Sequence, residues 1–165
     1  MTHRAVSSLA ILALLGTLMT AGAAAQDPEC PRWREAFATM PVKMLTIQAG
    51  AKTLAIRAKT ADSSERQAGG FQCATPTEIQ RNLILFDFGE EIVTQFHMRN
   101  VPAPLDIAFM KADGRIFSIL RMDASPTQLY GPMGPFRYAL EARAGFYDSQ
   151  GIRQGEARLV VPDSH

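Results

Sequence analysis

The sequence lacks a strong charge of either sign, with 17 Lys and Arg residues against 16 Asp and Glu residues and a net charge of +1. Its basic and acidic residues are interleaved along the chain. A nucleic-acid-binding domain usually carries a basic patch that contacts phosphates. The composition therefore excludes an electrostatic site for nucleic acid and indicates a solvated surface of mixed charge.

Histidine and cysteine are also scarce, with three histidines and two cysteines in the chain. A zinc site needs three or four ligands held close together. If Cys30 and Cys73 pair with one another, few ligands remain, so we expect no metal. His97 is then more simply a partly buried strand residue, and His165 is the last residue of the chain.

Three motifs that would signal catalysis or a cofactor are missing. The chain contains no Gly-x-Ser-x-Gly sequence, no glycine loop of the kind that cradles phosphate and no dinucleotide-binding fingerprint. A nucleophilic triad is therefore unsupported, and we expect no cofactor.

Long hydrophobic runs are missing except near the N-terminus. There, residues 9–19 form an apolar stretch after the basic Arg4, and residues 23–25 are three alanines. This pattern predicts a signal peptide over residues 1–25, with cleavage between Ala25 and Gln26. An uncleaved anchor is the alternative, but the run is shorter than the about 20 residues of a membrane span. We expect a periplasmic or secreted protein with no membrane span after cleavage, and losing Arg4 leaves no net charge.

Both cysteines, Cys30 and Cys73, follow the predicted cleavage point. An oxidising compartment favours a disulfide between them, with two free thiols as the alternative. The bond would close a loop of about 43 residues and disfavour the unfolded state by about 4 kcal/mol. It would also hold the N-terminal leader, residues 26–42, against the domain. We expect that leader to be irregular or to form one short helical turn.

The rest of the chain suits a single globular domain over residues 43–165. Short apolar segments, several of which alternate with polar residues, predict strands. Short helical segments are predicted over residues 64–68, which Ser63 caps, and over residues 75–79 and 145–150. The predicted strands cover residues 42–48, 52–59, 82–88, 92–100, 105–111, 115–122, 137–142 and 157–161.

These elements predict a mainly β (α+β) fold, either a curled antiparallel sheet or a small barrel-like domain with one or two short helices. Asp113 and Gly114 predict a hairpin turn, and Gly89 with Glu90 predict another turn. Residues 123–136 are rich in Pro and Gly, so we expect a long surface loop. The phenylalanines of the predicted strands are expected in the core.

Three linked motifs lie between residues 96 and 116. They read Phe96-x-Met98-Arg99-Asn100, Pro104-Leu105-Asp106-Ile107-Ala108-Phe109 and Asp113-Gly114-Arg115-Ile116. They resemble the family called domain of unknown function 192, whose pattern is Phe-Trp-Met-Lys-Asn-Thr followed by Pro-Leu-Asp-Ile. The resemblance covers about residues 43–161 and implies a small, mainly β domain, often exported in bacteria, with no established reaction. The family's Gly-Leu-Met reads Gly70-Phe71-Gln72 here, and its tryptophan is His97.

Arg99, Asn100 and Asp106 form the polar cluster of this stretch. We predict that they line a pocket with Glu141 and bind a polar ligand through directed hydrogen bonds. A guanidinium would favour a carboxylate or phosphate on that ligand. In the alternative, Arg99 and Asp106 form a cross-strand ion pair, Asn100 holds the turn, and Glu141 pairs with Arg66 or Arg99.

These residues support two functional hypotheses. The first is a non-enzymatic module that binds an unidentified small molecule or an envelope protein. The second is a hydrolase-like enzyme that uses Asp106 and Glu141 as an acid and a base, together with Arg99. Convergence of these side chains on a cleft would favour a site, whereas mutually satisfied pairs would favour a structural role. We expect a monomer, although no sequence feature indicates the oligomeric state.

Overall fold

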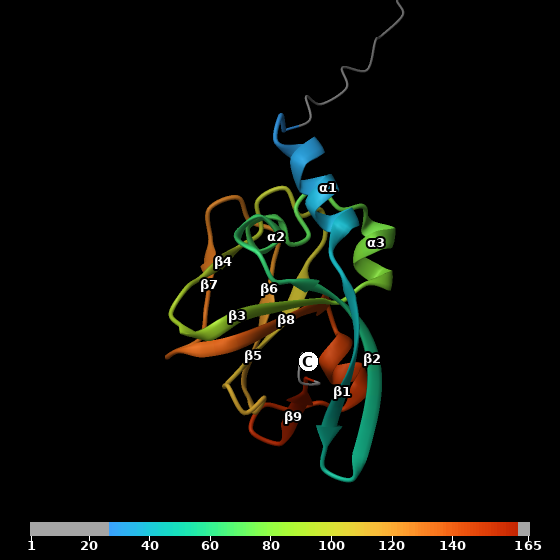
Figure 1. Ribbon diagram of the computed structural model, residues 1–165, viewed down its shortest axis with the longest axis vertical. Coiled ribbons are helices and arrows are strands. Elements are labelled where there is room, and N and C mark those ends of the chain that lie inside the picture. The colour runs from blue at the N-terminus through green and yellow to red at the C-terminus, as the bar shows by residue number, and fades with distance from the viewer. Residues whose placement is uncertain (1–26, 162–165) are drawn as a thin grey trace, which may run out of the picture.

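The computed structural model describes residues 27–161 (Figure 1). The predicted signal peptide, its cleavage point before Gln26 and the terminal His165 lie outside these residues. The described elements, in chain order, are α1 (Cys30–Thr39), β1 (Val42–Ala49), β2 (Lys52–Ala61), α2 (Ser64–Gly69), α3 (Pro76–Arg81), β3 (Ile84–Ile92), β4 (Phe96–His97), β5 (Leu105–Met110), β6 (Ile116–Met122), β7 (Leu129–Tyr130), β8 (Phe136–Arg143), α4 (Phe146–Gln150) and β9 (Ala157–Val160).

Seven strands form one sheet in the order β6-β5-β8-β3-β2-β1-β9, and β4 pairs with β7 in a separate two-stranded sheet. All neighbouring pairs are antiparallel except β2 and β3, which run parallel. The large sheet curls into a half-barrel, seen in Figure 1 as β1 and β2 sweeping around one side. The mainly β, curled and mostly antiparallel fold expected from the sequence is confirmed, with four described helices instead of one or two.

The two edges of the sheet approach each other where the start of β6 meets β9. Arg115 and Arg158 form an isolated antiparallel bridge, and the backbone N–H of Leu159 donates to the Gly114 carbonyl at 2.9 Å. A Cβ at Gly114 would lie 2.0 Å from the Leu159 carbonyl oxygen, and the backbone there has φ +82°. Only glycine permits this approach, so the predicted hairpin turn also joins the two edges of the curled sheet.

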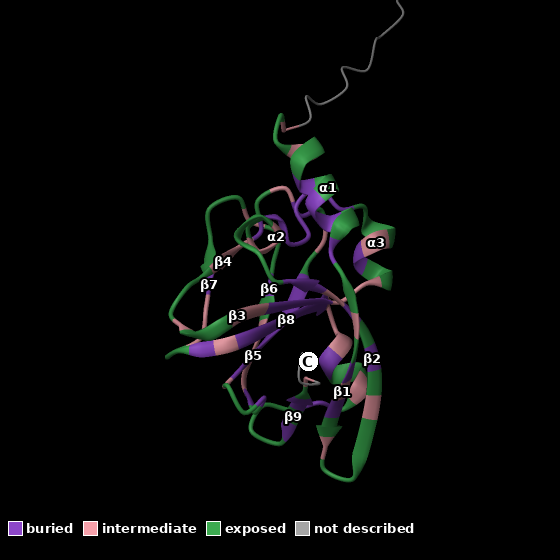
Figure 2. Ribbon diagram, in the orientation of Figure 1, coloured by how far each residue is buried: buried purple, intermediate pink, exposed green. Residues whose placement is uncertain are grey.

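The sheet buries a hydrophobic core on each face, because side chains alternate along a strand. The barrel core, inside the curl, contains Leu85, Ala108, Leu140 and Tyr147 with residues of β1, β2 and β9. The cap core, on the opposite face, contains Phe86, Ile107, Phe109, Phe136 and Ala139 and their neighbours from the helices and turns. Figure 2 shows the buried residues concentrated along β3, β5 and β8, which separate the two cores.

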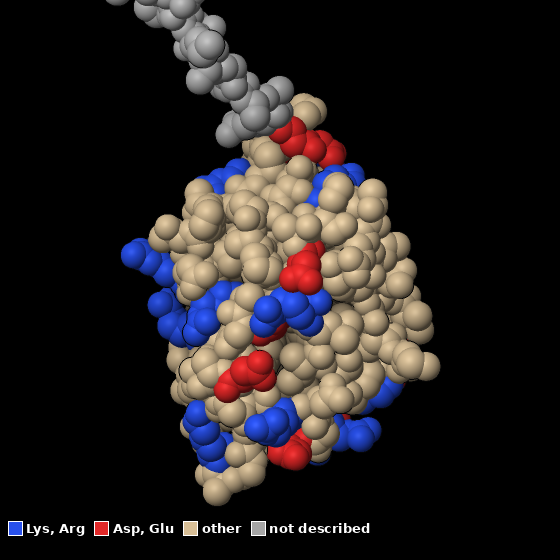
Figure 3. All heavy atoms as spheres, turned by 180° about the vertical axis from the view of Figure 1, so that it is seen from behind, with Lys and Arg blue, Asp and Glu red and all other residues tan. Residues whose placement is uncertain are grey.

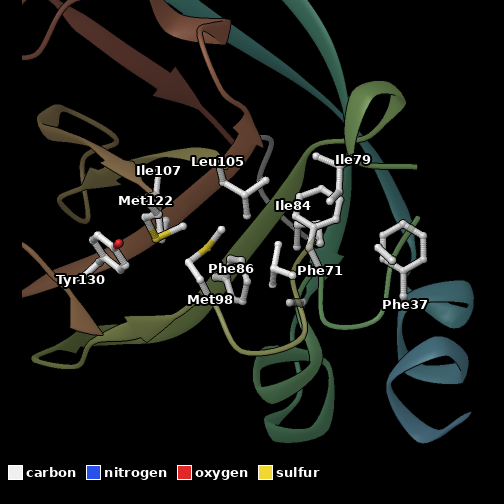
Figure 4. Packing of buried hydrophobic residues seen from close by; sticks show 14 of the residues in the cluster. Phe37, Phe71, Ile79, Ile84, Phe86, Met98, Leu105, Ile107, Met122 and Tyr130 are labelled. Atoms are coloured by element: carbon white, nitrogen blue, oxygen red, sulfur yellow. The ribbon is translucent and has the colours of Figure 1, made fainter. Parts of the chain in front are cut away.

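Helices α1 and α3 lie above the cap core. Figure 4 shows labelled side chains of this core running along the sheet from Phe37 on α1 to Tyr130 on β7. The leader was expected to be irregular or a single turn, but α1 has ten residues. Pro31 suits the first helical turn, and Trp33 and Phe37 share the face that α1 buries.

The predicted disulfide between Cys30 and Cys73 is confirmed, with the two Cα atoms 5.5 Å apart. It joins the start of α1 to the turn between α2 and α3. Cys73 has φ +57°, and its N–H donates to the Asn100 carbonyl at 2.8 Å. The disulfide therefore fixes α1 beside the turn that follows α2.

The strand predicted over residues 92–100 is wrong for most of its length. Ile92 is the last residue of β3, and after it only Phe96 and His97 form a strand, because Asn100 takes φ +59° and the Val101 N–H donates back to the Met98 carbonyl at 3.2 Å. Conversely, β3 continues through the turn expected at residues 89–90, with a register shift between Asp87 and Ile92.

The segment 123–136 also contains structure that its Pro and Gly content concealed. Leu129 and Tyr130 form β7 and pair with β4, and the Tyr130 hydroxyl donates to the Asp123 carbonyl at 3.0 Å. Residues of this segment are therefore tied to the strand that contains His97.

The described surface carries charges of both signs. Figure 3 shows Lys and Arg side chains interspersed with Asp and Glu on one face of the protein. Several of these charges are paired on the surface, among them Arg32 with Glu65 at 2.7 Å and Arg158 with Asp113 at 3.4 Å. No helix within residues 27–161 is long and apolar enough to cross a membrane.

Candidate ligand-binding pocket

The polar cluster expected at Arg99, Asn100 and Asp106 does not gather. The Arg99 side chain is exposed. The Asn100 side-chain amide donates to Asp27 Oδ2 at 2.8 Å, while its carbonyl accepts from Cys73. Asn100 therefore ties its turn to Cys73 and to the start of the described chain. The structural alternative had the side-chain amide hold the turn itself, but this amide bonds Asp27 instead.

Asp106 pairs with Arg121 instead of the expected Arg99. Its Oδ1 accepts from Arg121 Nε at 2.5 Å, and its Oδ2 accepts from the Gly145 N–H at 2.7 Å. The register between β5 and β6 places Arg121 directly opposite Asp106. The predicted Arg99–Asp106 ion pair is thus wrong, because it required β4 to extend to the turn and pair with β5.

Asp106 and Glu141 also lie on opposite faces of the sheet. Ile107 and Glu141 are partners across β5 and β8, so their side chains share the face of the cap core. Asp106 precedes Ile107 and points to the other face, where it lines a separate mixed-charge pocket with Arg121, Tyr147 and other residues. The two carboxyl groups do not converge as an acid and a base.

Glu141 alone of the four predicted residues lines a pocket on the cap-core face. Its side chain is buried, with 4% of the residue exposed. Its Oε2 atom is buried and has no hydrogen-bond partner among the described residues. Neither Arg66 nor Arg99 reaches it, since Arg66 binds Asp62 at 2.8 Å and the Thr39 carbonyl at 3.0 Å.

This Glu141 pocket has a volume of about 290 Å³. Its walls come from α2 and the turn after it, from β3, and from the segment around β4. It is lined by Gln67, Ala68, Gly69, Gly70, Phe71, Gln72, Phe86, Phe88, Thr94, Gln95, Phe96, His97, Val101 and Glu141.

Helix α2 is held over the sheet by side-chain hydrogen bonds. Ser63 caps its start by accepting from the Arg66 N–H at 3.5 Å, as its sequence predicted. The Gln67 amide donates to the Asp87 carbonyl of β3 at 3.0 Å, and the Gln72 amide donates to the Ala68 carbonyl at 2.8 Å. The Gln67 bond fixes this wall of the pocket against β3, and the Gln72 bond ties the turn after α2 to the helix.

Phenyl rings form much of the apolar wall. Phe86 meets Phe96 edge to face with ring centroids 5.0 Å apart, and Phe86 and Phe88 stack at 6.3 Å. Phe86 belongs to the cap core and Phe88 and Phe96 pack against it, as the sequence led us to expect. No sequence pattern indicated that the same rings, together with Phe71, also border a cavity.

The pocket is electrically neutral at neutral pH. Burial raises the pKa of Glu141 to about 8, so its carboxyl group is mostly protonated at pH 7. Burial and the nearby positive charge of Arg99 lower the pKa of His97 below its usual 6.5. His97 Nδ1 accepts a hydrogen bond from the backbone N–H of Arg99 at 3.3 Å. Both groups are therefore mostly uncharged at pH 7, and both can exchange hydrogen bonds with a guest molecule.

Two solved structures are similar in fold. One is a proposed transcription regulator from Sinorhizobium meliloti 1021, with a TM-score of 0.66 and 24% identity over 73% of this chain and 94% of that one. The other is a protein of unknown function from Novosphingobium aromaticivorans DSM 12444, with a TM-score of 0.64 and 25% identity over 73% of this chain and 85% of that one.

No functionally curated protein matches the sequence. The profile of the DUF192 family, described as "Uncharacterized ACR", matches residues 45–159. This match covers the whole sheet from β1 to β9 except the first three residues of β1 and the last residue of β9. The chain therefore belongs to the DUF192 family, as the motifs between residues 96 and 116 indicated.

Proposed function

We propose that this chain is an exported, non-enzymatic domain that binds a small molecule in the Glu141 pocket. The observation that carries the proposal is the buried Oε2 of Glu141, which borders the cavity and has no partner among the described residues. Buried polar atoms are nearly always hydrogen-bonded, and leaving one unpaired costs about 1–3 kcal/mol. A bound molecule would supply the missing partner.

The composition of the walls supports a small ligand. Small-molecule sites usually combine apolar and aromatic walls with a few directed polar groups, in cavities of roughly 300–1,000 Å³. The Glu141 pocket has four phenylalanines, three glutamines, one histidine and one carboxyl group, and its volume of about 290 Å³ lies just below that range. We therefore propose a compact ligand with one polar group directed at Glu141.

Binding without catalysis is favoured over the hydrolase-like alternative. A two-carboxylate mechanism needs both groups on one substrate, but Asp106 lies on the opposite face from Glu141 and is already paired with Arg121 and the Gly145 N–H.

Export is proposed from the sequence of residues 1–25. The full-length chain, expressed in a Gram-negative host, should appear in the periplasmic fraction. Its mass should equal that of a chain whose first residue is Gln26. Retention in the cytoplasm with an intact N-terminus would overturn this part of the proposal.

The binding proposal can be tested by a thermal-shift screen of oxidised residues 26–165 against amines, organic acids, sugars, nucleotides and peptidoglycan fragments. A ligand at about 100 times its dissociation constant adds about 2.7 kcal/mol to the free energy of unfolding. Thr94 is exposed at the pocket, whereas Thr127 is exposed outside it. Thr94→Trp should abolish the shift, and the matched Thr127→Trp should keep it.

Two outcomes would contradict the binding proposal. One is a panel in which no compound raises the melting temperature. The other is a stabilising compound that acts equally on Thr94→Trp and on the unmodified protein, because its site would then lie elsewhere.

A further inference from the structure

On the proposed function the Glu141 pocket holds a small molecule; we infer that this molecule is a small organic cation, a primary alkylammonium whose nitrogen lies beside Glu141. Its N–H groups would donate to the carboxylate, and its alkyl chain would pack against the phenyl rings. The lining residues, the unpaired oxygen and the arrangement of surrounding charges each support this class of ligand.

The charges of the lining exclude an anionic guest. Among the described residues that line the pocket, Glu141 is the one acidic residue, and none is Lys or Arg. A buried anion without a counter-charge is very costly, and it would be repelled by an ionised Glu141. The sequence had suggested a carboxylate or phosphate ligand because Arg99 was expected here, but Arg99 does not line the pocket.

Hydrogen bonding favours an ammonium group in particular. Glu141 Oε2 lacks a donor among the described residues, and a primary ammonium carries three N–H donors and no acceptor. A quaternary ammonium would match the charge but would leave the oxygen unpaired. Phenyl faces also attract a cation that lies within about 6 Å of the ring centroid, and Phe71, Phe86, Phe88 and Phe96 border the same cavity.

Charged groups on the helices near the pocket are already engaged. Arg66 of α2 pairs with Asp62 at 2.8 Å, and Glu78 of α3 pairs with Arg34 of α1 at 2.5 Å. Because Arg66 and Arg34 are paired with other carboxylates, neither serves as a counter-ion for Glu141.

The basic side chains on the strands around Glu141 likewise interact with other groups. Lys59 of β2 donates to the Phe37 carbonyl at 2.8 Å. Arg143, two residues along β8, donates to the Ala144 carbonyl at 3.2 Å, and Arg137 lies 3.7 Å from Asp87.

The remaining neighbours are two titratable groups and one ion pair. His97 lines the pocket and is neutral above about pH 6.5, its ordinary pKa, because its own pKa is lowered. Tyr147 and the Asp106–Arg121 pair lie on the other face of the sheet. No described side chain therefore supplies the positive charge that an ionised Glu141 would need.

Binding of the cation should release a proton. Burial alone raises the pKa of Glu141 to about 8, so at pH 7 about 0.9 of the carboxyl groups carry a proton that the ammonium must displace. The apparent dissociation constant scales inversely with the ionised fraction, so affinity should rise about tenfold between pH 7 and pH 9. An alkylammonium stays mostly protonated over that range, since its pKa is about 10.4.

The test compares three probes of equal length: butylammonium, butanol and butyrate. Amide NMR titration of oxidised residues 26–165 at pH 7 and pH 9 locates the binding site of each probe and measures its dissociation constant. Calorimetry in two buffers of different ionisation enthalpy gives the number of protons released. Butylammonium should shift the amides of Gly70 and Phe71, bind about tenfold more tightly at pH 9, and release about 0.9 proton at pH 7.

Glu141→Gln keeps the shape of the side chain and removes its charge. It should weaken butylammonium binding at pH 9 at least about tenfold and abolish both the pH dependence and the proton release. Glu90→Gln, at an exposed position of β3 outside the pocket, is the matched control and should change neither.

The outcomes separate this inference from the proposed function. If butanol perturbs the pocket amides as strongly as butylammonium, and Glu141→Gln binds both equally, the pocket is a binding site but its ligand is neutral. If butyrate binds best, the ligand is an anion and the cation assignment is wrong. If none of the probes and no compound of the wider screen perturbs these amides, both the cation inference and the small-molecule function fail.

Discussion

Gly70 lies directly against the carboxyl group of Glu141. A Cβ on Gly70 would come within 3.5 Å of Glu141 Oε2 and within 3.3 Å of Phe86 Cζ. Gly70 also has φ +48° and ψ −129°, a backbone conformation that side-chain-bearing residues rarely adopt. The glycine therefore both ends α2 and leaves open the space beside the buried acid.

Gly70→Ala should destabilise the protein and obstruct the pocket. The strained backbone should lower the free energy of unfolding by about 1–3 kcal/mol, measured by urea denaturation. Gly155→Ala is the matched control, because Gly155 has φ +81° but a Cβ added there would meet no atom within 4 Å. Both variants should lose stability, whereas only Gly70→Ala should weaken butylammonium binding; equal binding by the two would place the ligand away from Gly70.

Glu141 should make the unliganded protein less stable as the pH rises. Its pKa is about 8 in the folded state against 4.5 for an unperturbed glutamate. Between these values the folded state holds a proton that the unfolded state has released. The free energy of unfolding should therefore fall by up to about 1.4 kcal/mol per pH unit from pH 5 to pH 8, and this contribution should then level off.

Glu141→Gln isolates this effect, because glutamine does not titrate. The difference in free energy of unfolding between Glu141→Gln and the unmodified protein should grow in favour of the variant from pH 5 to pH 8. The measurement is urea denaturation of both proteins at each pH without ligand. A constant difference across the range would mean that Glu141 is ionised or solvated in the folded state.

The fold was largely predictable from local sequence patterns. The segment 52–59 alternates as a half-buried strand should, and β2 buries Ile56 and Ala58 while Arg57 is exposed. By contrast, the contact between the sheet edges at Gly114 depends on Leu159, which is distant in the sequence. No local pattern carries that information.

The shortness of β4 has the same kind of cause. Its apolar residues fit a strand, but the positive φ of Asn100 is stabilised by contacts with Cys73 and Asp27. Tertiary hydrogen bonds thus override the strand pattern, as commonly happens for short segments.

The candidate site was predictable only in part. Glu141 stood out because it is an acidic residue among apolar neighbours on a strand, and that signal led to the pocket. Asp106 carried an equally good signal, but its partner depends on the pairing of β5 with β6. The sequence did not predict that phenylalanines would line a pocket, since a ring that fills a core and a ring that borders a cavity look alike in sequence.

Asp106→Ala should cost stability without affecting the Glu141 pocket. The substitution removes a charged hydrogen bond to Arg121 and one to the Gly145 N–H, and each bond of this type contributes about 1.5–3 kcal/mol. We expect a loss of at least about 2 kcal/mol in the free energy of unfolding, measured in urea.

Binding of butylammonium to Asp106→Ala should be unchanged, because Asp106 faces the opposite side of the sheet. Asp106→Asn, which can still accept from Gly145, should lose less stability. If a folded Asp106→Asn variant loses binding, Asp106 acts on the ligand after all, and the sequence-based assignment would be restored.

The disulfide should stabilise both the fold and the pocket. It closes a loop with a sequence separation of 43 residues, and its loss should lower the free energy of unfolding by about 4 kcal/mol. Cys73 follows Gln72, which lines the pocket, and its N–H bonds the turn at Asn100. Without the bond to Cys30, this wall is held by hydrogen bonds and packing alone.

The Cys30→Ser/Cys73→Ser double variant should therefore unfold at lower urea concentration and bind butylammonium more weakly than the oxidised protein. Dithiothreitol should reproduce both effects in the unmodified protein and change nothing in the double variant. An unfolding midpoint that is the same in all four samples would mean that α1 is held to the domain without the disulfide, because packing of Trp33 and Phe37 would then suffice.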